Sequence, residues 1–239
     1  MTNVNHILAE TSNRQYPLPE RKWKYYQEWH DTVFFHWKVP KCLIENYIPE
    51  GLELDLHDNI AWISLVAFEV KNMTVRNLPP FPYVSNFHEI NVRTYVIKNG
   101  IRGIYLFSIE TDKLIEVLLT RLFIGLPYKK SHIERSTNQL SSENKISNYQ
   151  LDIQFKGIFP LTEKSKLDYW LTERHSLYEN CNKKICRFDI HHKEWKLNLL
   201  DAKINAIKYN AGRFNLNLYP DKIQYSKKID VLLWAKKAV

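Results

Sequence analysis

The alternation of apolar and polar side chains between residues 87 and 110 predicts a β-hairpin. Two sets of residues alternate along its first strand: Ile90, Val92, Thr94 and Val96 on one side, and Glu89, Asn91, Arg93 and Tyr95 on the other. Successive side chains of a strand point to opposite faces, so each set occupies its own face. Asn99-Gly100 supplies the positive φ values of a type I′ turn. The apolar return strand over residues 103–109 indicates that the hairpin is buried.

Similar alternation predicts strands along the rest of the chain. The expected strands cover residues 32–39, 52–56, 60–69, 149–156, 177–178, 185–191, 196–206 and 229–234. Short helices are expected over residues 41–47, 113–124 and 166–174, with Thr162 or Ser165 as cap candidates for the last. This order predicts an α+β fold that is mainly antiparallel β. We expect a large sheet or barrel with two or three short helices packed on it, and such a barrel can hold a ligand cavity.

Three segments lack a clear alternation. Residues 21–31 are aromatic and charged, and are interpreted as a short helix or a covering segment. Residues 136–147 are polar and are expected to form a loop. The strands expected over residues 52–56 and 60–69 are predicted to pair with each other around a turn at Asp58-Asn59. Residues 1–20 contain Pro17 and Pro19 and are predicted to be a loosely ordered N-terminal arm. No repeat or linker interrupts residues 21–239, which predicts a single domain.

Composition narrows the classes of protein that the chain can belong to. A hydrophobic content of 44% in 239 residues supports a substantial core. No run of about 18 apolar residues occurs, and the N-terminus does not resemble a signal peptide, so no membrane partner is expected. Three cysteines without metal-type spacing suit reduced thiols in the cytoplasm. A Cys181–Cys186 bridge across a hairpin is the alternative.

The net charge of +8 is concentrated in the second half of the chain. Residues 1–120 hold 12 Lys and Arg against 14 Asp and Glu, and residues 121–239 hold 22 against 12. A basic half can bind nucleic acid or an acidic protein partner. The lysines are scattered between strand-forming residues, however, with no recognition helix, zinc finger or basic run. This pattern favours a solvated cationic surface.

The polar face of residues 89–93 is the first candidate site. A buried strand that carries Glu, Asn and Arg must pair these groups with one another or with a ligand. In one interpretation Arg93 clamps a carboxylate and Glu89 transfers protons. In the other, Arg93 and Glu89 form a buried ion pair that fixes the barrel geometry. Asn91 and Tyr95 share this face and are ligand-contact candidates in the first interpretation.

The second candidate site combines Arg121 with residues 125–130, GLPYKK. A lysine that is buried or beside another cation has a depressed pKa and can form a Schiff base with a ketone. Lysines at a helix end can equally be solvated and complement the helix dipole.

The histidines at 175, 191 and 192 are a third group. His191 and His192 are adjacent, so on a strand they point to opposite faces and cannot easily share a metal. No HExxH or CxxC motif accompanies them, and neither a metal site nor a cofactor is expected.

A series of motifs along residues 30–235 resembles a known bacterial family. The motifs are HWxVP at 36–40, IPxGLxLD at 48–55, AWxSLVxF at 61–68, ExNVRTYV at 89–96, LPY at 126–128, LTER at 171–174 with Tyr178, and HHxxW at 191–195. Their order is similar to that of the YqjF-like family, domain of unknown function 2071. That family resembles the acetoacetate decarboxylase-like superfamily, which implies a β-cone or barrel with a central cavity.

The resemblance to acetoacetate decarboxylase also implies roles for individual residues. The enzyme's pattern has a glutamate on a central strand, which Glu89 resembles, and an arginine six positions before Pro-Lys-Lys, which Arg121 resembles. Tyr128 occupies the position of the Schiff-base lysine, and Lys129 matches the lysine that follows it. Ser64 stands where a second acid is expected. Decarboxylation therefore lacks its nucleophile and one acid here.

Together these observations predict a cytoplasmic protein whose cavity binds a small organic anion, similar to a keto acid. Arg93, Arg121 and Glu89 are the expected polar contacts, with Asn91, Tyr95 and Tyr128 beside them. The enzyme alternative is a Schiff-base decarboxylase or lyase that acts through Lys129 with Glu89. The interaction alternative uses the basic second half, and a homo-oligomer is compatible with each reading.

Overall fold

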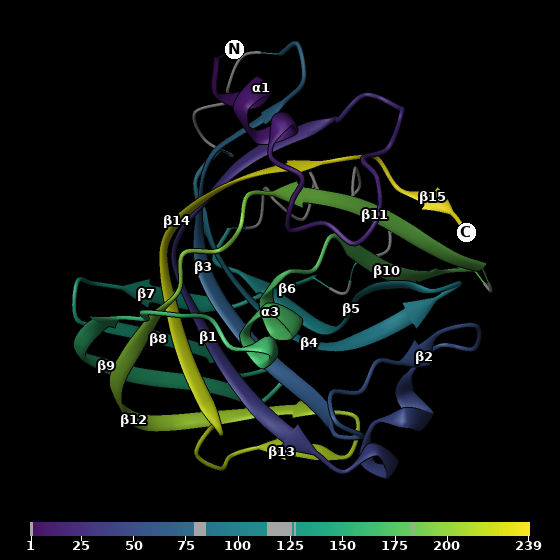
Figure 1. Cartoon of the computed structure of the whole chain (residues 1–239). Helices are drawn as coiled ribbons and strands as arrows, with labels where there is room; N and C mark the ends of the chain where they lie inside the picture. The colour runs from purple at the N-terminus through teal and green to yellow at the C-terminus, as the bar shows by residue number, and fades with distance from the viewer. Residues whose placement is uncertain (1, 79–84, 114–125, 127, 183) are drawn as a thin grey trace.

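The computed structural model describes residues 2–78, 85–113, 126, 128–182 and 184–239 (Figure 1). The strands are β1 (Tyr25–Val39), β2 (Glu53–Leu54), β3 (Ala61–Val75), β4 (Phe87–Lys98), β5 (Ile101–Thr111), β6 (Tyr128–Lys130), β7 (His132–Arg135), β8 (Gln139–Asn144), β9 (Tyr149–Pro160), β10 (Ser176–Cys181), β11 (Lys184–His192), β12 (Asn198–Ala211), β13 (Phe214–Leu216), β14 (Lys222–Leu233) and β15 (Lys237–Ala238). The helices are α1 (Thr2–Ala9) and α3 (Lys166–Thr172), with 3-10 turns η1 (Lys41–Leu43) and η2 (Glu45–Tyr47). None of these helices is long and apolar enough to cross a membrane.

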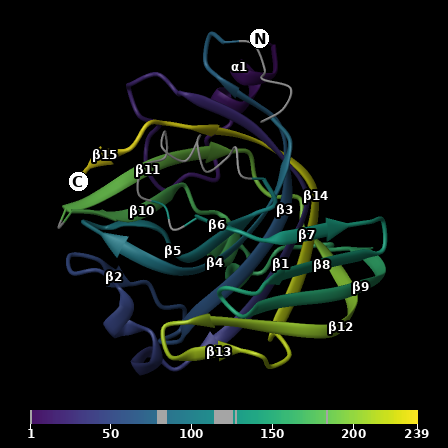
Figure 2. The ribbon, with the colours of Figure 1, turned by 180° about the vertical axis from the view of Figure 1, so that it is seen from behind.

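The long strands close on themselves. They are hydrogen-bonded in the order β11-β10-β5-β4-β3-β1-β14, and the ring is completed where the end of β14 pairs with β11. Neighbouring strands in the ring are antiparallel except β5 and β10, which are parallel. The start of β14 pairs instead with β12, which continues into β9, β8 and β7. Figures 1 and 2 show this second group of strands beside the ring, running across β1 and β3. The predicted mainly antiparallel α+β architecture is confirmed.

Strand alternation divides the apolar residues between two cores. Phe34 and Val66 point into the ring, where they belong to an inner core. Their chain neighbours Phe35 and Leu65 point the other way, into an outer core shared with β8, β9 and β12. The ring strands β1 and β3 are therefore apolar on both faces, because each face is covered.

The central hairpin forms as expected. β4 and β5 are joined at Asn99 and Gly100, whose φ values are +51° and +74°. The register shifts after Val92, because Phe107 is an extra residue on β5. Such a bulge changes which residues of a strand face inward. Both Leu106 and Ile109 consequently face the interior of the ring.

Helix α3 also matches its prediction. Ser165 and Asp168 form a capping box at its start, in which each side chain bonds the other residue's backbone N–H. Trp170 and Leu171 of α3 pack into the inner core. The helix predicted over residues 113–124 lies outside the described residues, except for Lys113. Cys42, Cys181 and Cys186 are free thiols, so the bridge alternative is wrong in this structure.

Two predictions of non-strand segments are wrong. Residues 21–31, expected to be a short helix or a covering segment, contain the start of β1. Gln27 points inward there between Tyr25 and Trp29, and this polar residue interrupts the apolar alternation of the strand. The segment expected to be a loop contains β8, whose inward residues include Asn144. Asn144 is buried because its Nδ2 donates to Glu110 Oε1 at 3.0 Å. Polar residues thus occupy positions where the pattern requires apolar ones.

The expected pairing of residues 52–56 with 60–69 is also incorrect. The turn at Asp58-Asn59 is present, with a single bridge between His57 and Ile60. β2, however, pairs with β4 rather than with β3.

The N-terminal segment lies against the ring rather than forming a loose arm. Ile7 of α1 packs against Leu232 and Trp234. Arg14 Nη1 donates to the carbonyl oxygen of Ile190 at 2.7 Å, and the Tyr16 hydroxyl bonds Ser176 Oγ at 2.6 Å. These contacts place residues 2–16 over β10, β11 and the end of β14.

Strands β5 and β10 approach each other closely at Gly103. A Cβ atom on Gly103 would lie 2.7 Å from the carbonyl oxygen of Ser176 and 2.7 Å from the Tyr178 ring. We expect Gly103→Ala to lower the free energy of unfolding by about 2 to 3 kcal/mol, because the backbone of β10 must move. Gly157→Ala is the control, since its Cβ would meet the exposed ring of Phe159, which can rotate. Denaturant unfolding of both variants checks this, and equal losses would contradict it.

Candidate functional site

The inner core surrounds a cavity of about 70 Å³. This is room for a few water molecules or for one small organic molecule. Its walls are mostly apolar side chains from β1, β3, β5, β10, β11 and β14, such as Phe34, Leu106 and Phe188. Four polar residues also line it: Gln27, Glu89, Asn91 and Arg93. An apolar pocket with a few convergent polar groups is typical of a small-molecule site.

Strand β4 supplies three of the four polar residues. Glu89, Asn91 and Arg93 are spaced by two, and the ring geometry turns their common face to the cavity. This is the arrangement that their alternation in the sequence predicts. Gln27 comes from the first part of β1 and accepts a 2.7 Å hydrogen bond from Trp29 Nε1. Sequence reasoning missed Gln27, because this segment was not recognised as a strand.

Arg93 is buried with little to neutralise its charge. Its side chain is 7% exposed, and its Nη2 donates a long bond of 3.5 Å to the carbonyl oxygen of Leu171. The guanidinium carbon lies 5.8 Å from the centre of the Phe34 ring. Within the described residues, Nε has no hydrogen-bond partner and no carboxylate lies within 4.0 Å. Burial lowers the pKa of Arg93, and the neighbouring Tyr95 and Glu89 oppose this shift.

Glu89 lies in the same cavity but forms no ion pair with Arg93. Its Oε1 accepts a 3.2 Å hydrogen bond from Asn91 Nδ2. Burial raises the pKa of Glu89 to about 7, although the bond from Asn91 and the charge of Arg93 act in the opposite direction. Glu89 can therefore be neutral or charged near neutral pH. Glu89 and Arg93 therefore do not form the direct structural ion pair of the second interpretation.

Tyr95 points inward but does not line the cavity. Its hydroxyl lies 2.5 Å from Ser64 Oγ, which in turn lies 2.7 Å from His36 Nδ1. Burial lowers the pKa of His36 to about 3, so this imidazole is neutral. The Tyr95 ring packs 4.5 Å from that of Trp170. Tyr95 thus belongs to a buried hydrogen-bonded chain behind the polar face.

Lys129 lies on the opposite side of the ring wall from the cavity. On β6 it pairs with Glu110, and its Nζ lies 4.7 Å from the centre of the Tyr149 ring in the outer region. This placement does not support a Schiff base formed inside the cavity by Lys129. Tyr128 pairs through its backbone with Ile109, and its side chain, like all of Arg121, lies outside the described residues.

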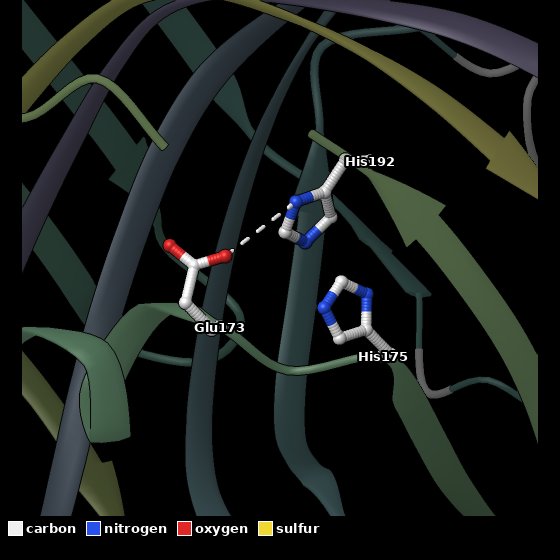
Figure 3. Close-up of side chains that lie close together, drawn as sticks. All are labelled: Glu173, His175 and His192. Carbon is white, nitrogen blue, oxygen red and sulfur yellow. Dashed lines mark ion pairs between the residues drawn. The ribbon is translucent and has the colours of Figure 1, made fainter. Parts of the chain in front are cut away.

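A second polar cluster lies next to the cavity but does not line it. Glu173, His175 and His192 are buried, and one potential ligand atom of each lies within 4.8 Å of the other two (Figure 3). The ring of His191 lies 6.0 Å from that of His175, but its Nε2 contacts the carbonyl oxygen of Ile7 at 2.7 Å, and His191 is not part of the group. The expected separation of the adjacent histidines is therefore observed. The sequence analysis grouped His175 with His192 and expected no metal site, but it did not include Glu173, which the C-terminal end of α3 brings to the end of β11.

The family of the chain follows from comparison with known proteins. The DUF2071 family model, described as an uncharacterized conserved protein, matches residues 26–230. The chain belongs to this family. The uncharacterized protein YqjF of Bacillus subtilis is 36% identical over 225 residues, which cover 91% of this chain and 93% of YqjF. The resemblance seen in the motifs of this DUF2071 protein is thereby confirmed.

Solved structures share the fold of this DUF2071 protein at low sequence identity. Acetoacetate decarboxylase from Legionella pneumophila has a TM-score of 0.60 at 14% identity, covering 95% of this chain and 93% of the enzyme. The enduracididine biosynthesis enzyme MppR, in complex with pyruvate, has a TM-score of 0.59 at 8% identity, covering 95% and 94%. These likenesses establish an acetoacetate decarboxylase-like fold.

The raised pKa of Glu89 makes stability depend on pH. A carboxyl group with a folded-state pKa near 7 and an ordinary value of 4.5 holds its proton more tightly in the folded state. The contribution of Glu89 to the free energy of unfolding is therefore fully present below pH 4.5 and is lost as the pH rises to 7. Relative to Glu89→Gln, the wild type should lose roughly 2 to 3 kcal/mol of unfolding free energy over this range. Urea unfolding at several pH values measures the difference.

The matched control for this measurement is Glu53→Gln, on the exposed side of β2. Its stability should follow the wild-type curve over the same pH range. A wild-type curve that runs parallel to that of Glu89→Gln would show that Glu89 ionises as an ordinary surface glutamate.

Proposed function

We propose that this protein binds a small organic anion of the 2-oxo acid class in the inner cavity. Arg93 binds the carboxylate of the ligand, and Glu89 with Asn91 contacts its oxo group. The observation that carries this proposal is the buried guanidinium group of Arg93, which faces the cavity without a carboxylate partner in the described part of the chain.

The buried charge of Arg93 requires compensation. Transfer of an ionised group from water to an apolar interior is costly unless an opposite charge meets it. Arginine remains protonated in proteins, so Arg93 cannot escape this cost by losing its proton. A carboxylate in the cavity would accept two parallel N–H bonds from the guanidinium fork, which is the strong bidentate geometry. Arg93 thus supplies a cation at the cavity wall for a ligand carboxylate.

Glu89 extends the match to a second polar group of the ligand. Below pH 7 its carboxyl group is largely protonated and can donate a hydrogen bond to an oxo oxygen. Asn91 Nδ2 donates one hydrogen to Glu89 Oε1 and carries a second N–H that can donate to the same oxo oxygen. A pKa near neutrality also suits a group that exchanges a proton with a bound molecule. A 2-oxo acid presents the carboxylate and oxo oxygens that these residues would bind.

The size of the cavity and its setting agree with this ligand class. Pyruvate is a small 2-oxo acid, and MppR, which shares the fold, has been solved in complex with pyruvate. The apolar residues around the polar face would exclude water and strengthen the charged contact. The free thiols of all three cysteines are compatible with action in the cytoplasm.

Calorimetric titration with pyruvate at pH 6 tests the proposal. Arg93→Met preserves side-chain bulk but removes the charge, and should weaken binding on the order of 100-fold. Lys129→Met is the matched control, because Lys129 faces away from the cavity, and it should bind pyruvate as the wild type does. Circular dichroism of each variant confirms that it is folded.

Two outcomes would overturn this assignment. Wild-type protein that shows no heat of binding and no change in thermal stability with millimolar pyruvate, oxaloacetate or 2-oxoglutarate would exclude the ligand class. A Lys129→Met variant that loses binding while Arg93→Met retains it would transfer the function to the Schiff-base alternative.

A further inference from the structure

We propose that Glu173, His175 and His192 form a binding site for one divalent transition-metal ion. The three residues come from the C-terminal end of α3, the position before β10 and the last position of β11. Their potential ligand atoms lie within 4.8 Å of one another, and all three residues are buried. In Figure 3 a nitrogen of each ring and an oxygen of the carboxylate are turned toward the space between them.

The strongest support comes from His175. Its side chain is 2% exposed, and neither ring nitrogen has a hydrogen-bond partner in the described residues. A buried polar group without a partner costs about 1 to 3 kcal/mol, and such groups in native proteins call for an explanation. Asn13, which covers the cluster, has a buried Oδ1 that is also without a partner among the described residues. Unsatisfied polar atoms are thus gathered around the same place.

His192 is oriented as a metal ligand usually is. Its Nδ1 lies 2.7 Å from the carbonyl oxygen of Lys193, so Nδ1 carries the proton in this contact. A metal ion would bind the other ring nitrogen, Nε2, in place of the hydrogen bond that His192 makes with the backbone of Arg174. A histidine ligand almost always donates its second N–H to such an acceptor, which fixes the tautomer and the ring orientation.

Glu173 contributes a carboxylate whose two oxygens have different surroundings. Oε1 bonds Lys164 Nζ at 2.5 Å and the backbone N–H of Trp195 at 3.2 Å. Oε2 accepts a 2.9 Å bond from Asn13 Nδ2 and lies 4.0 Å from His192 Nδ1. A metal ion can bind Oε2 while Lys164 remains on Oε1. The pairing with Lys164 weakens the attraction for a cation, and the contacts at Oε1 hold the carboxylate in position.

The ligand set identifies the class of metal. Two imidazoles and one carboxylate bind Zn²⁺ in several zinc enzymes and Fe²⁺ in oxygenases, and they leave at least one coordination position open. Metal–ligand distances of about 2.0 to 2.2 Å require the three side chains to draw together slightly. The bound ion would join α3, β10 and β11 at one end of the ring. Trp195 contacts His192 and also lines the cavity, but none of the three ligands lines it.

The test uses the full chain freed of metal with a chelator and titrated with Zn²⁺. We expect one Zn²⁺ per chain and a rise in the thermal unfolding temperature on binding. His175→Gln and His192→Gln should each weaken binding by on the order of 100-fold or more and abolish the rise in temperature. His191→Gln is the matched control, because His191 is a buried neighbour outside the cluster, and it should behave as the wild type. Co²⁺ in place of Zn²⁺ should give visible absorption bands that His175→Gln removes.

Circular dichroism of the metal-free variants shows whether each is folded. Should a glutamine variant fail to fold, His175→Asn and Glu173→Gln replace it in the same titration. Wild-type protein that binds no Zn²⁺ or Co²⁺, or variants of the cluster that bind as tightly as His191→Gln, would overturn the proposal and leave the cluster to an ordered water. Neither result depends on whether the cavity binds a 2-oxo acid.

Discussion

Keeping the guanidinium group of Arg93 away from bulk water costs free energy unless negative charge meets it. In the described residues its polar contacts are weak, with one 3.5 Å bond to the carbonyl oxygen of Leu171. Glu89 does not form an ion pair with it, and burial raises the pKa of Glu89 to about 7 rather than stabilising its charge. The polar face of β4 is therefore not self-sufficient. The carboxylate of the ligand that we propose would compensate the charge of Arg93.

The closed ring of strands keeps the side chain of Arg93 away from bulk water. β14 pairs with β11 at one end and with β12 at the other, so the ring closes and a second group of strands covers its outside. Gly103 allows β5 and β10 to approach each other closely. The bulge at Phe107 turns Leu106 and Ile109 inward, beside their partners Arg93 and Asn91 of the polar face. Closure thus gives Arg93 apolar surroundings. The antiparallel pairing of β10 with β11 brings His175, just before β10, next to His192 at the end of β11.

Much of the fold and part of the candidate site could be predicted from the sequence, namely where the local alternation of side chains agrees with their positions in the folded structure. The turn at Asn99-Gly100 and the polar face of Glu89, Asn91 and Arg93 follow from period-two alternation alone. The pattern failed where buried residues are polar: Gln27 concealed the start of β1, and Asn144, bonded to Glu110, concealed β8. The cluster of Glu173, His175 and His192 depends on the end of α3 meeting the end of β11. No spacing along the chain encodes that meeting, so the side chains could be placed only in three dimensions.

A crystal structure of the protein in complex with pyruvate tests the central claim most directly. The account predicts that the pyruvate carboxylate lies within hydrogen-bond distance of the Arg93 guanidinium group, with its oxo oxygen toward Glu89 or Asn91. A cavity that holds no pyruvate at a saturating concentration would contradict it. So would pyruvate bound at another place while Arg93 keeps its present surroundings.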